Sequence, residues 1–104
     1  MELTFTQAGS ELTPHGSVDL VSRKTFVDAG LEVLGEYGSL SVNMRAVDFM
    51  DSVGIGAVVE LARAAASHGG TFSVVDPSPP VQRVLAVTGL ADAWPPNGRS
   101  TDNT

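Results

Sequence analysis

The chain has 104 residues, of which 42% are hydrophobic and 17% charged, with no cysteine and a formal net charge of −6. This length predicts one domain, and the lack of cysteine excludes a disulfide framework, a cysteine nucleophile and a thiolate zinc site. The acidic side chains outnumber the basic ones by 12 to 6. Nucleic acid and anionic lipid are therefore disfavoured as partners, because both carry negative charge.

No segment has the pattern of a membrane span or an export signal. The apolar stretch 55–66 is broken by two charged residues and is shorter than the roughly 20 apolar residues that cross a bilayer. Residues 1–4 lack the basic start and apolar run of a signal peptide. We therefore expect a cytoplasmic protein without a membrane partner. His15 and His68 lie far apart, with no acidic or cysteine companions, so no metal site is predicted.

The first elements expected are two strands. Residues 3–6 alternate between apolar and polar side chains and lead through a turn into residues 11–15, which predicts a hairpin near one edge of a sheet. Proline cannot donate to a strand ladder, so we expect Pro14 to keep the second strand away from the sheet centre unless it lies at a bulge. Residues 16–19 are interpreted as the turn that follows.

A first helix and a buried strand come next. Ser22 is a favourable N-cap, and apolar residues recur at helical spacing after it, which predicts an amphipathic helix over residues 23–36. Residues 39–44 form a short apolar run that is typical of a strand buried on both faces. Phe49 and Met50 are expected to return to the core after a polar turn.

The second helix has the clearest signals. Asp51 and Ser52 are both N-cap residue types, and His68-Gly69-Gly70 provides the end of the helix. Its apolar face consists of Ile55, Val58, Val59, Ala62 and Ala65. Residues 71–75 are predicted to be a strand. A strand, a helix and a strand in this order predict a right-handed βαβ unit with parallel strands.

A third helix is predicted from Ser78, which we expect to cap it, to Thr88, with prolines in its first turn. Trp94 is expected to pack in the core of a domain of residues 1–94. Residues 95–104, rich in Pro, Asn, Ser and Thr, are expected to be a disordered tail. The complete order predicts an α/β domain whose mixed sheet has four or five strands with helices packed on it.

The segment that joins the central strand to the second helix is the best candidate for a site, because ligands and partners of parallel α/β sheets gather at such positions. Free N–H groups at a helix start favour a phosphate or a carboxylate. Gly54 and Gly56 would let another chain approach the backbone closely. The alternative is that Asp51 or Ser52 only caps the helix and the glycines only pack.

Four segments resemble a known family. They are Asp48-Phe49-Met50-Asp51-Ser52-Val53-Gly54-Ile55-Gly56, residues 69–79, residues 81–90 and Gly16-Ser17-Val18-Asp19-Leu20. In this order and at this spacing they resemble the STAS domain of anti-sigma factor antagonists, over residues 11–94. The resemblance implies the STAS fold.

The resemblance also implies partner switching, with no enzymatic activity and no cofactor in this chain. In that family the unphosphorylated antagonist binds an anti-sigma factor that is also a serine kinase, and so frees a sigma factor for RNA polymerase. Phosphorylation releases the antagonist, and a separate phosphatase restores it. Turn formation is an equal alternative for Asp19. The implied partner-binding residues are Asp48, Asp51, Ser52, Val53, Gly54, Ile55, Gly56 and Asp19.

The chain departs from the family at the usual phosphoacceptor, the position directly before the glycine, where Val53 has no hydroxyl. Three interpretations follow: a permanently active antagonist, Ser52 as a substitute acceptor, or a scaffold role without a phosphate cycle. We expect loss of the usual switch, because the Ser52 hydroxyl is expected to turn toward backbone N–H groups as a helix cap.

Two other functions compete with this one. Gly54, Gly56 and Asp76 imitate a dinucleotide-binding fingerprint, but Val59 stands where a small residue is needed, which argues against a nucleotide-dependent enzyme. A STAS subunit of a transporter or of a stress-signalling complex would need the same loop and no phosphate. The edge hairpin leaves both a monomer and a paired form open.

Overall fold

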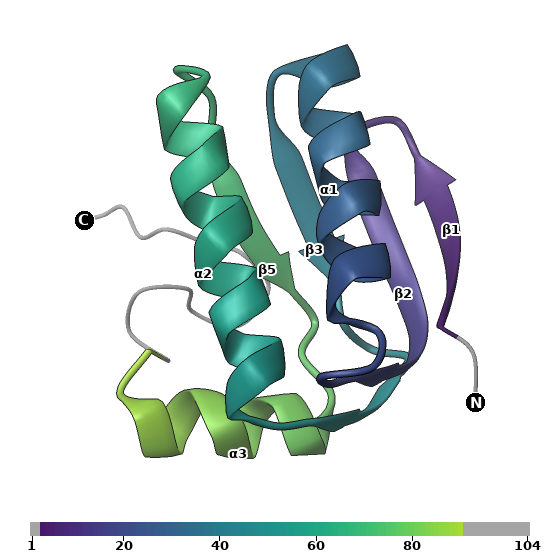
Figure 1. The fold of residues 1–104 in the computed structure, drawn as a ribbon, viewed down its shortest axis with the longest axis vertical. Helices are drawn as coiled ribbons and strands as arrows, with labels where there is room; N and C mark the ends of the chain where they lie inside the picture. Colours follow the sequence, from purple (N-terminus) through teal and green to yellow (C-terminus); the bar gives the residue numbers. More distant parts are fainter. Residues whose placement is uncertain (1–2, 91–104) are drawn as a thin grey trace.

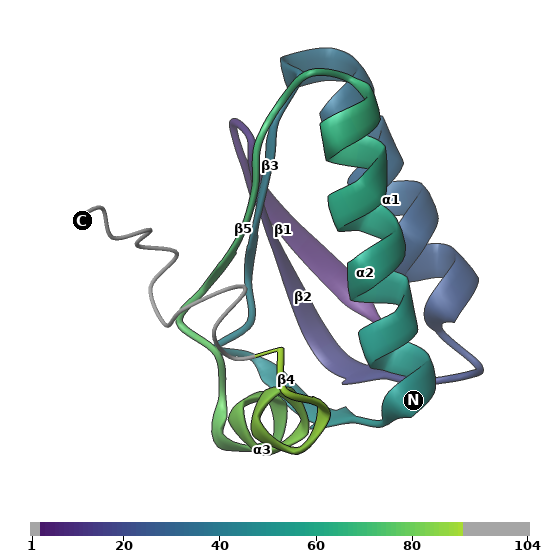
Figure 2. The ribbon, with the colours of Figure 1, turned by 90° about the vertical axis from the view of Figure 1, so that its left-hand side faces the viewer.

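The computed structural model describes residues 3–90, which form a mixed sheet and three helices. The elements in chain order are β1 (Thr4–Ala8), β2 (Glu11–Val18), α1 (Arg23–Tyr37), β3 (Leu40–Asn43), β4 (Val47–Met50), α2 (Ser52–Ser67), β5 (Phe72–Val75) and α3 (Pro79–Thr88). The helices α1 and α2 lie side by side over one face of the sheet, and α3 lies across one end of it (Figures 1 and 2). The predicted α/β class is confirmed.

The sheet has the order β1-β2-β3-β5, with β4 paired to β2 off this path. Only the β1–β2 pair among these is antiparallel; β3 and β4 both run parallel to β2, and β5 runs parallel to β3. The sheet is therefore mixed, as predicted, and its five strands lie within the predicted four or five. The parallel pairing of β3 with β5 across α2 also confirms the parallel strands of the predicted βαβ unit.

The core lies between the sheet and the pair α1 and α2. Leu12, Val42 and Val74 are neighbours in register on three adjacent strands, and all three are buried. The helices cover this row with side chains at helical spacing, as the sequence periodicity predicts. Those that are buried include Phe26, Val27, Val33 and Leu34 from α1 and Ile55, Val58, Leu61 and Ala65 from α2.

The predicted position of Pro14 near the sheet edge is wrong, because β2 is an interior strand. It pairs with β1 on one side and with both β3 and β4 on the other. The register with β3 ends at Leu12, whereas the register with β4 begins at Gly16. Pro14 pairs with Phe5 of β1 on one side of β2, and on the other side it lies between the end of one parallel register and the start of the other.

The predicted turn over residues 16–19 and the polar turn before Phe49 are also partly wrong. Residues 16–18 continue β2, and Val47–Met50 is an additional strand that pairs with them. Met50 returns to the core as expected, but Phe49 is 48% exposed. A four-residue strand with exposed residues at its two central positions has no clear apolar alternation, which is why the sequence did not predict it.

The two serines predicted to cap helices occupy the cap positions, but neither side chain bonds a helix N–H group. The Ser22 hydroxyl donates to the Ser17 carbonyl oxygen at 2.6 Å, and the Ser78 hydroxyl donates to the Val47 carbonyl oxygen at 2.5 Å. Both hydroxyls thus satisfy carbonyl groups of neighbouring strands. The predicted cap positions of these two serines are therefore confirmed, but the expected hydrogen bond from a helix N–H to the hydroxyl is not formed.

Trp94 and the predicted tail of residues 95–104 lie outside the described residues. Within residues 3–90, no helix is both long and apolar enough to cross a membrane.

Candidate partner-binding site

The predicted loop runs from β4 into the first two turns of α2, and Asp51 sets its shape. The Asp51 backbone is extended, and its Oδ1 accepts a hydrogen bond from the Gly54 N–H at 3.0 Å. The Asp51 carbonyl oxygen accepts the first helical bond, from the Ile55 N–H at 3.0 Å. This is N-cap geometry, so the predicted capping role is confirmed for Asp51.

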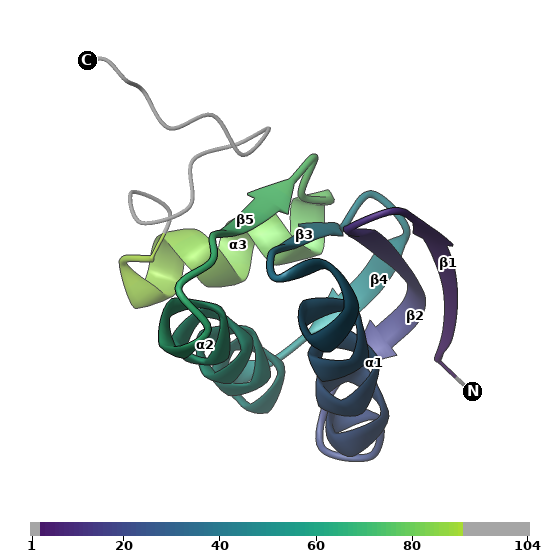
Figure 3. The same cartoon turned by 90° about the horizontal axis from the view of Figure 1, so that it is seen from above.

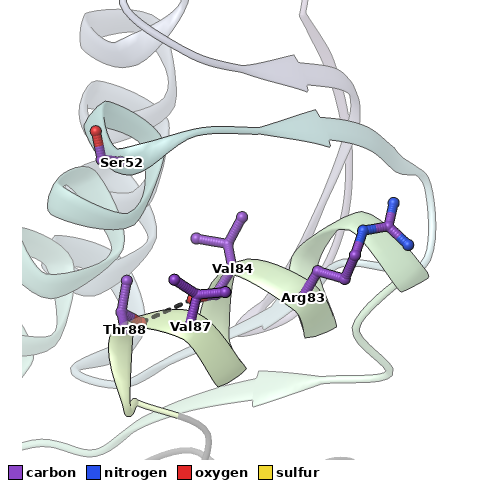
Figure 4. Close-up of a pocket in the computed structure, with 5 residues that line it drawn as sticks. All are labelled: Ser52, Arg83, Val84, Val87 and Thr88. Carbon is purple, nitrogen blue, oxygen red and sulfur yellow. Dashed lines mark hydrogen bonds between the residues drawn. The ribbon is translucent and has the colours of Figure 1, made fainter.

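Ser52 is the first residue of α2 and is exposed, and the structure contradicts its expected capping role. Because Asp51 already occupies the cap, the Ser52 side chain points outward, and it makes no hydrogen bond within residues 3–90. Ser52 and residues of α3 line an open cavity of about 250 Å³. Figure 4 shows Val84, Val87 and Thr88 on the far side and the Arg83 guanidinium directed away from Ser52.

The two glycines of the loop differ in their surroundings. A Cβ atom added to Gly54 would lie 2.3 Å from the Val18 carbonyl oxygen and 2.9 Å from the Met50 Cγ, so the helix start packs directly on the strand ends. A Cβ added to Gly56 would meet nothing within 4 Å. Gly54 and Ile55 are buried, whereas Gly56 is exposed and Val53 is half-buried. Of the two glycines, Gly56 is therefore the one that another chain can approach.

Asp48 and Asp19 lie at the same end of the sheet, because β2 and β4 run parallel and their last residues pair. Asp48 is exposed and accepts a hydrogen bond from the Ser17 hydroxyl at 3.1 Å. Asp19 Oδ1 accepts from the Val21 N–H at 3.0 Å and from the Ser22 N–H at 3.1 Å. Asp19 thus forms the turn between β2 and α1, and that turn also lies beside the loop.

The sequence interpretation missed three exposed apolar side chains at this end. Leu20 is 73% exposed, Val21 is 89% exposed and Phe49 is 48% exposed. The sequence did contain a signal for this exposure, because two aliphatic residues directly follow Asp19, which was predicted to form a turn. An ion pair joins the neighbouring helices here, since Arg23 Nη2 lies 2.5 Å from Glu60 Oε1.

The two histidines lie on separate elements and bond to local groups. His15 Nε2 lies 2.7 Å from the Thr6 hydroxyl on the neighbouring strand, and His68 Nδ1 lies 2.9 Å from the Ala64 carbonyl oxygen. In the part of the chain that the structure describes, no three His, Cys, Asp or Glu side chains group in a way that could hold a metal ion.

Replacement of Asp51 by alanine tests the cap. We expect Asp51→Ala to lower the free energy of unfolding by about 1 kcal/mol, because the Gly54 N–H loses its acceptor. Asp51→Asn, which keeps an acceptor oxygen, should lose much less. Urea unfolding followed by circular dichroism measures both. Asp48→Ala is the matched control, and an equal loss for Asp48→Ala and Asp51→Ala would contradict the capping assignment.

The chain was compared with known proteins. A family model described as "Mlab, STAS domain" matches residues 1–95. A protein of Thermotoga maritima, named as a candidate anti-sigma factor antagonist, is 33% identical over 54 residues, which are 52% of this chain and 48% of that protein. The match thus spans about half the length of that relative.

Solved structures share the fold. An anti-sigma factor antagonist from Mycobacterium paratuberculosis has a TM-score of 0.75 at 22% identity, covering 94% of this chain and 86% of its own. Unphosphorylated SpoIIAA, an anti-sigma factor antagonist, has a TM-score of 0.71 at 19% identity, covering 96% and 89%. Both structures share the overall fold of this chain. Because the family model covers nearly the whole chain and the fold agrees with it, the chain belongs to the STAS domain family.

Proposed function

We propose that this protein is an anti-sigma factor antagonist: it binds an anti-sigma factor of the serine kinase type and so frees a sigma factor for transcription. The names of the Thermotoga and Mycobacterium relatives support this assignment. The observation that carries it is the Asp51-capped start of α2, which holds Ser52 and Gly56 exposed on one loop. Such a protein acts in the cytoplasm, where sigma factors bind RNA polymerase, and a stress response is the process it would regulate.

The loop divides into residues that touch the partner and residues that shape it. Asp48, Ser52 and Gly56 are exposed, and Val53 is half-buried, so these residues would meet the anti-sigma factor. The other three residues shape the loop without touching the partner: Gly54 and Ile55 pack against the core, and Asp51 caps α2. Asp19 acts through the turn between β2 and α1.

The phosphate cycle has two alternatives under this proposal. Val53 cannot accept a phosphate, which leaves a permanently active antagonist as one. Ser52 has the single hydroxyl of residues 48–56, and it is exposed and not used as a cap, which supports it as a substitute acceptor. A phosphate there adds about −1.5 to −2 charges beside Asp48 and Asp51, so it would repel a partner shaped for the neutral loop. A separate phosphatase would then restore binding.

The test mixes the purified protein with each anti-sigma factor of its source organism, with and without ATP, and records binding by calorimetry and the intact mass. Binding of one anti-sigma factor supports the proposal, and no binding contradicts it. A mass gain of one phosphate that Ser52→Ala abolishes identifies the substitute acceptor. Binding with unchanged mass identifies the permanently active form.

A charge at position 53 should weaken the complex. We expect Val53→Asp to lower the affinity for the anti-sigma factor at least about tenfold, because it adds a carboxylate to a docking site that already holds Asp48 and Asp51. Val53→Thr, which keeps the shape and, in the absence of ATP, adds no charge, should bind within a few-fold of the natural protein. Titration calorimetry measures both. Equal affinity for Val53→Asp and the natural protein would place the docking site elsewhere.

A STAS subunit of a transporter or of a stress-signalling complex is the second candidate. The description of the matching family model names Mlab and does not mention anti-sigma factors, which favours keeping this alternative. Affinity capture from the source organism separates the two candidates. Recovery of a transporter ATPase or a large scaffold protein, with no anti-sigma factor, would favour the second.

A further inference from the structure

The turn between β2 and α1 holds two aliphatic side chains out in solvent. Leu20 is 73% exposed and Val21 is 89% exposed. Isolated exposed apolar residues are common, but these two are consecutive and their backbone is held in place. Asp19 Oδ1 accepts from two N–H groups of the turn, and the Ser22 hydroxyl accepts from the Asp19 N–H at 3.1 Å. The turn therefore presents both side chains in a defined direction.

This turn is joined to α2. Arg23, directly after the turn, pairs with Glu60 on α2. The two helices also pack closely, since a Cβ on Gly30 would lie 2.6 Å from the Leu61 Cδ2. Figures 1 and 3 show the start of α1 beside the first turns of α2. The turn and the outward side of α2 thus form one surface.

On the outward side of α2, Gly56 leaves the helix backbone without a covering side chain. Ser52, Gly56 and Glu60 follow one another at a spacing of four residues, and all three are exposed. A glycine inside a helix is less favourable than alanine, and nothing among the described residues lies close enough to require Gly56. The fold of the described residues does not require this glycine, and its missing side chain leaves the backbone of α2 open to close approach by another chain.

Acidic side chains without a cationic partner among the described residues flank the turn and the loop. Asp19, Asp48 and Asp51 all lie here, and none of them forms an ion pair within residues 3–90. The nearby cations Arg23 and Lys24 are already paired, with Glu60 and Asp28 respectively. A partner surface with lysine or arginine around an apolar centre is the electrostatic complement.

We propose that Leu20, Val21 and Gly56 form the apolar centre of a docking surface, the turn–helix surface, which is continuous with residues 48–56 and has Asp19, Asp48 and Asp51 at its rim. Its occupant is an anti-sigma factor surface whose aliphatic side chains pack on Leu20 and Val21 and across Gly56, with lysine or arginine facing the rim. This inference rests on the proposed function and adds the second half of the interface.

The test uses the anti-sigma factor that binds the natural protein in the assay above. We expect the double variant Leu20→Ser/Val21→Ser to bind at least about tenfold more weakly, because the apolar area buried in the complex is lost. The matched control is Leu31→Ser/Tyr37→Ser, which removes two exposed apolar side chains from the rest of α1 and should bind within twofold. Val21→Asp serves if the double variant does not fold.

Three outcomes contradict the inference. Equal affinity of the natural protein and the folded turn variant would overturn the turn–helix surface and leave the proposed function standing. Sedimentation that finds the natural protein dimeric and the turn variant monomeric would assign the surface to a second copy of this chain. A natural protein that binds no anti-sigma factor would overturn the proposed function itself, and with it the occupant named here.

Discussion

Gly54→Ala should unfold at a clearly lower urea concentration than the natural protein, whereas Gly56→Ala, two residues further along the same helix, should be at least as stable. A methyl group on Gly54 would lie 2.3 Å from the Val18 carbonyl oxygen, so the start of α2 must move away from β2. Overpacking against a backbone atom costs about 3 kcal/mol. At Gly56 the methyl group meets nothing within 4 Å and gains up to about 1 kcal/mol of helix propensity.

Urea unfolding monitored by circular dichroism measures both variants under the same conditions. The pair controls itself, because the substitution and the helix are the same and only the surroundings of the glycine differ. A loss of similar size for both variants would mean that the start of α2 does not pack on the end of β2 as the structure has it. It would also remove the reason for assigning Gly56 to a partner.

Gly56→Leu should weaken the binding of the anti-sigma factor at least about tenfold while the protein stays folded. The exposed side of α2 is flat at Gly56, and a leucine there places four carbon atoms where the partner is expected to approach the helix backbone. Gly35→Leu is the matched control, since Gly35 is an exposed glycine of α1 whose Cβ would also meet nothing within 4 Å. We expect this control to bind like the natural protein.

Calorimetric titration of the two leucine variants, with unfolding curves for both, decides this prediction. Normal binding by a folded Gly56→Leu variant would exclude the outward side of α2 from the interface. An equal loss of affinity in both variants would indicate a general effect of an added leucine rather than a docking site at Gly56.

Local signals in the sequence were sufficient for most of the elements. The apolar spacing of α1 and α2 and the glycine after α1 act within a few residues, and the helix bounds agree with the prediction to within one or two residues. The cap at Asp51 is equally local, because its acceptor oxygen and the Gly54 N–H are three residues apart. The resemblance then predicts a partner site on the loop that Asp51 shapes, and that site stays a prediction.

The errors concern partners that are distant in the sequence. Ser78 was expected to cap α3, but its hydroxyl bonds the Val47 carbonyl oxygen, 31 residues away. Pro14 was expected near an edge, but β2 lies between β1 and two parallel neighbours. In each case local preference was overridden by a group that pattern analysis does not bring close.

The amino-acid sequence alone establishes the order of the helices and of every strand but β4, the parallel unit around α2 and the absence of a hydroxyl at Val53, since each of these follows from residue type and short-range spacing. It does not distinguish Gly54 from Gly56, or an outward Ser52 from a capping one. The fold makes these distinctions because they depend on whether the end of β2 or solvent faces each residue. Which residues of the loop are exposed to a partner is therefore decided by how the start of α2 packs on the end of β2.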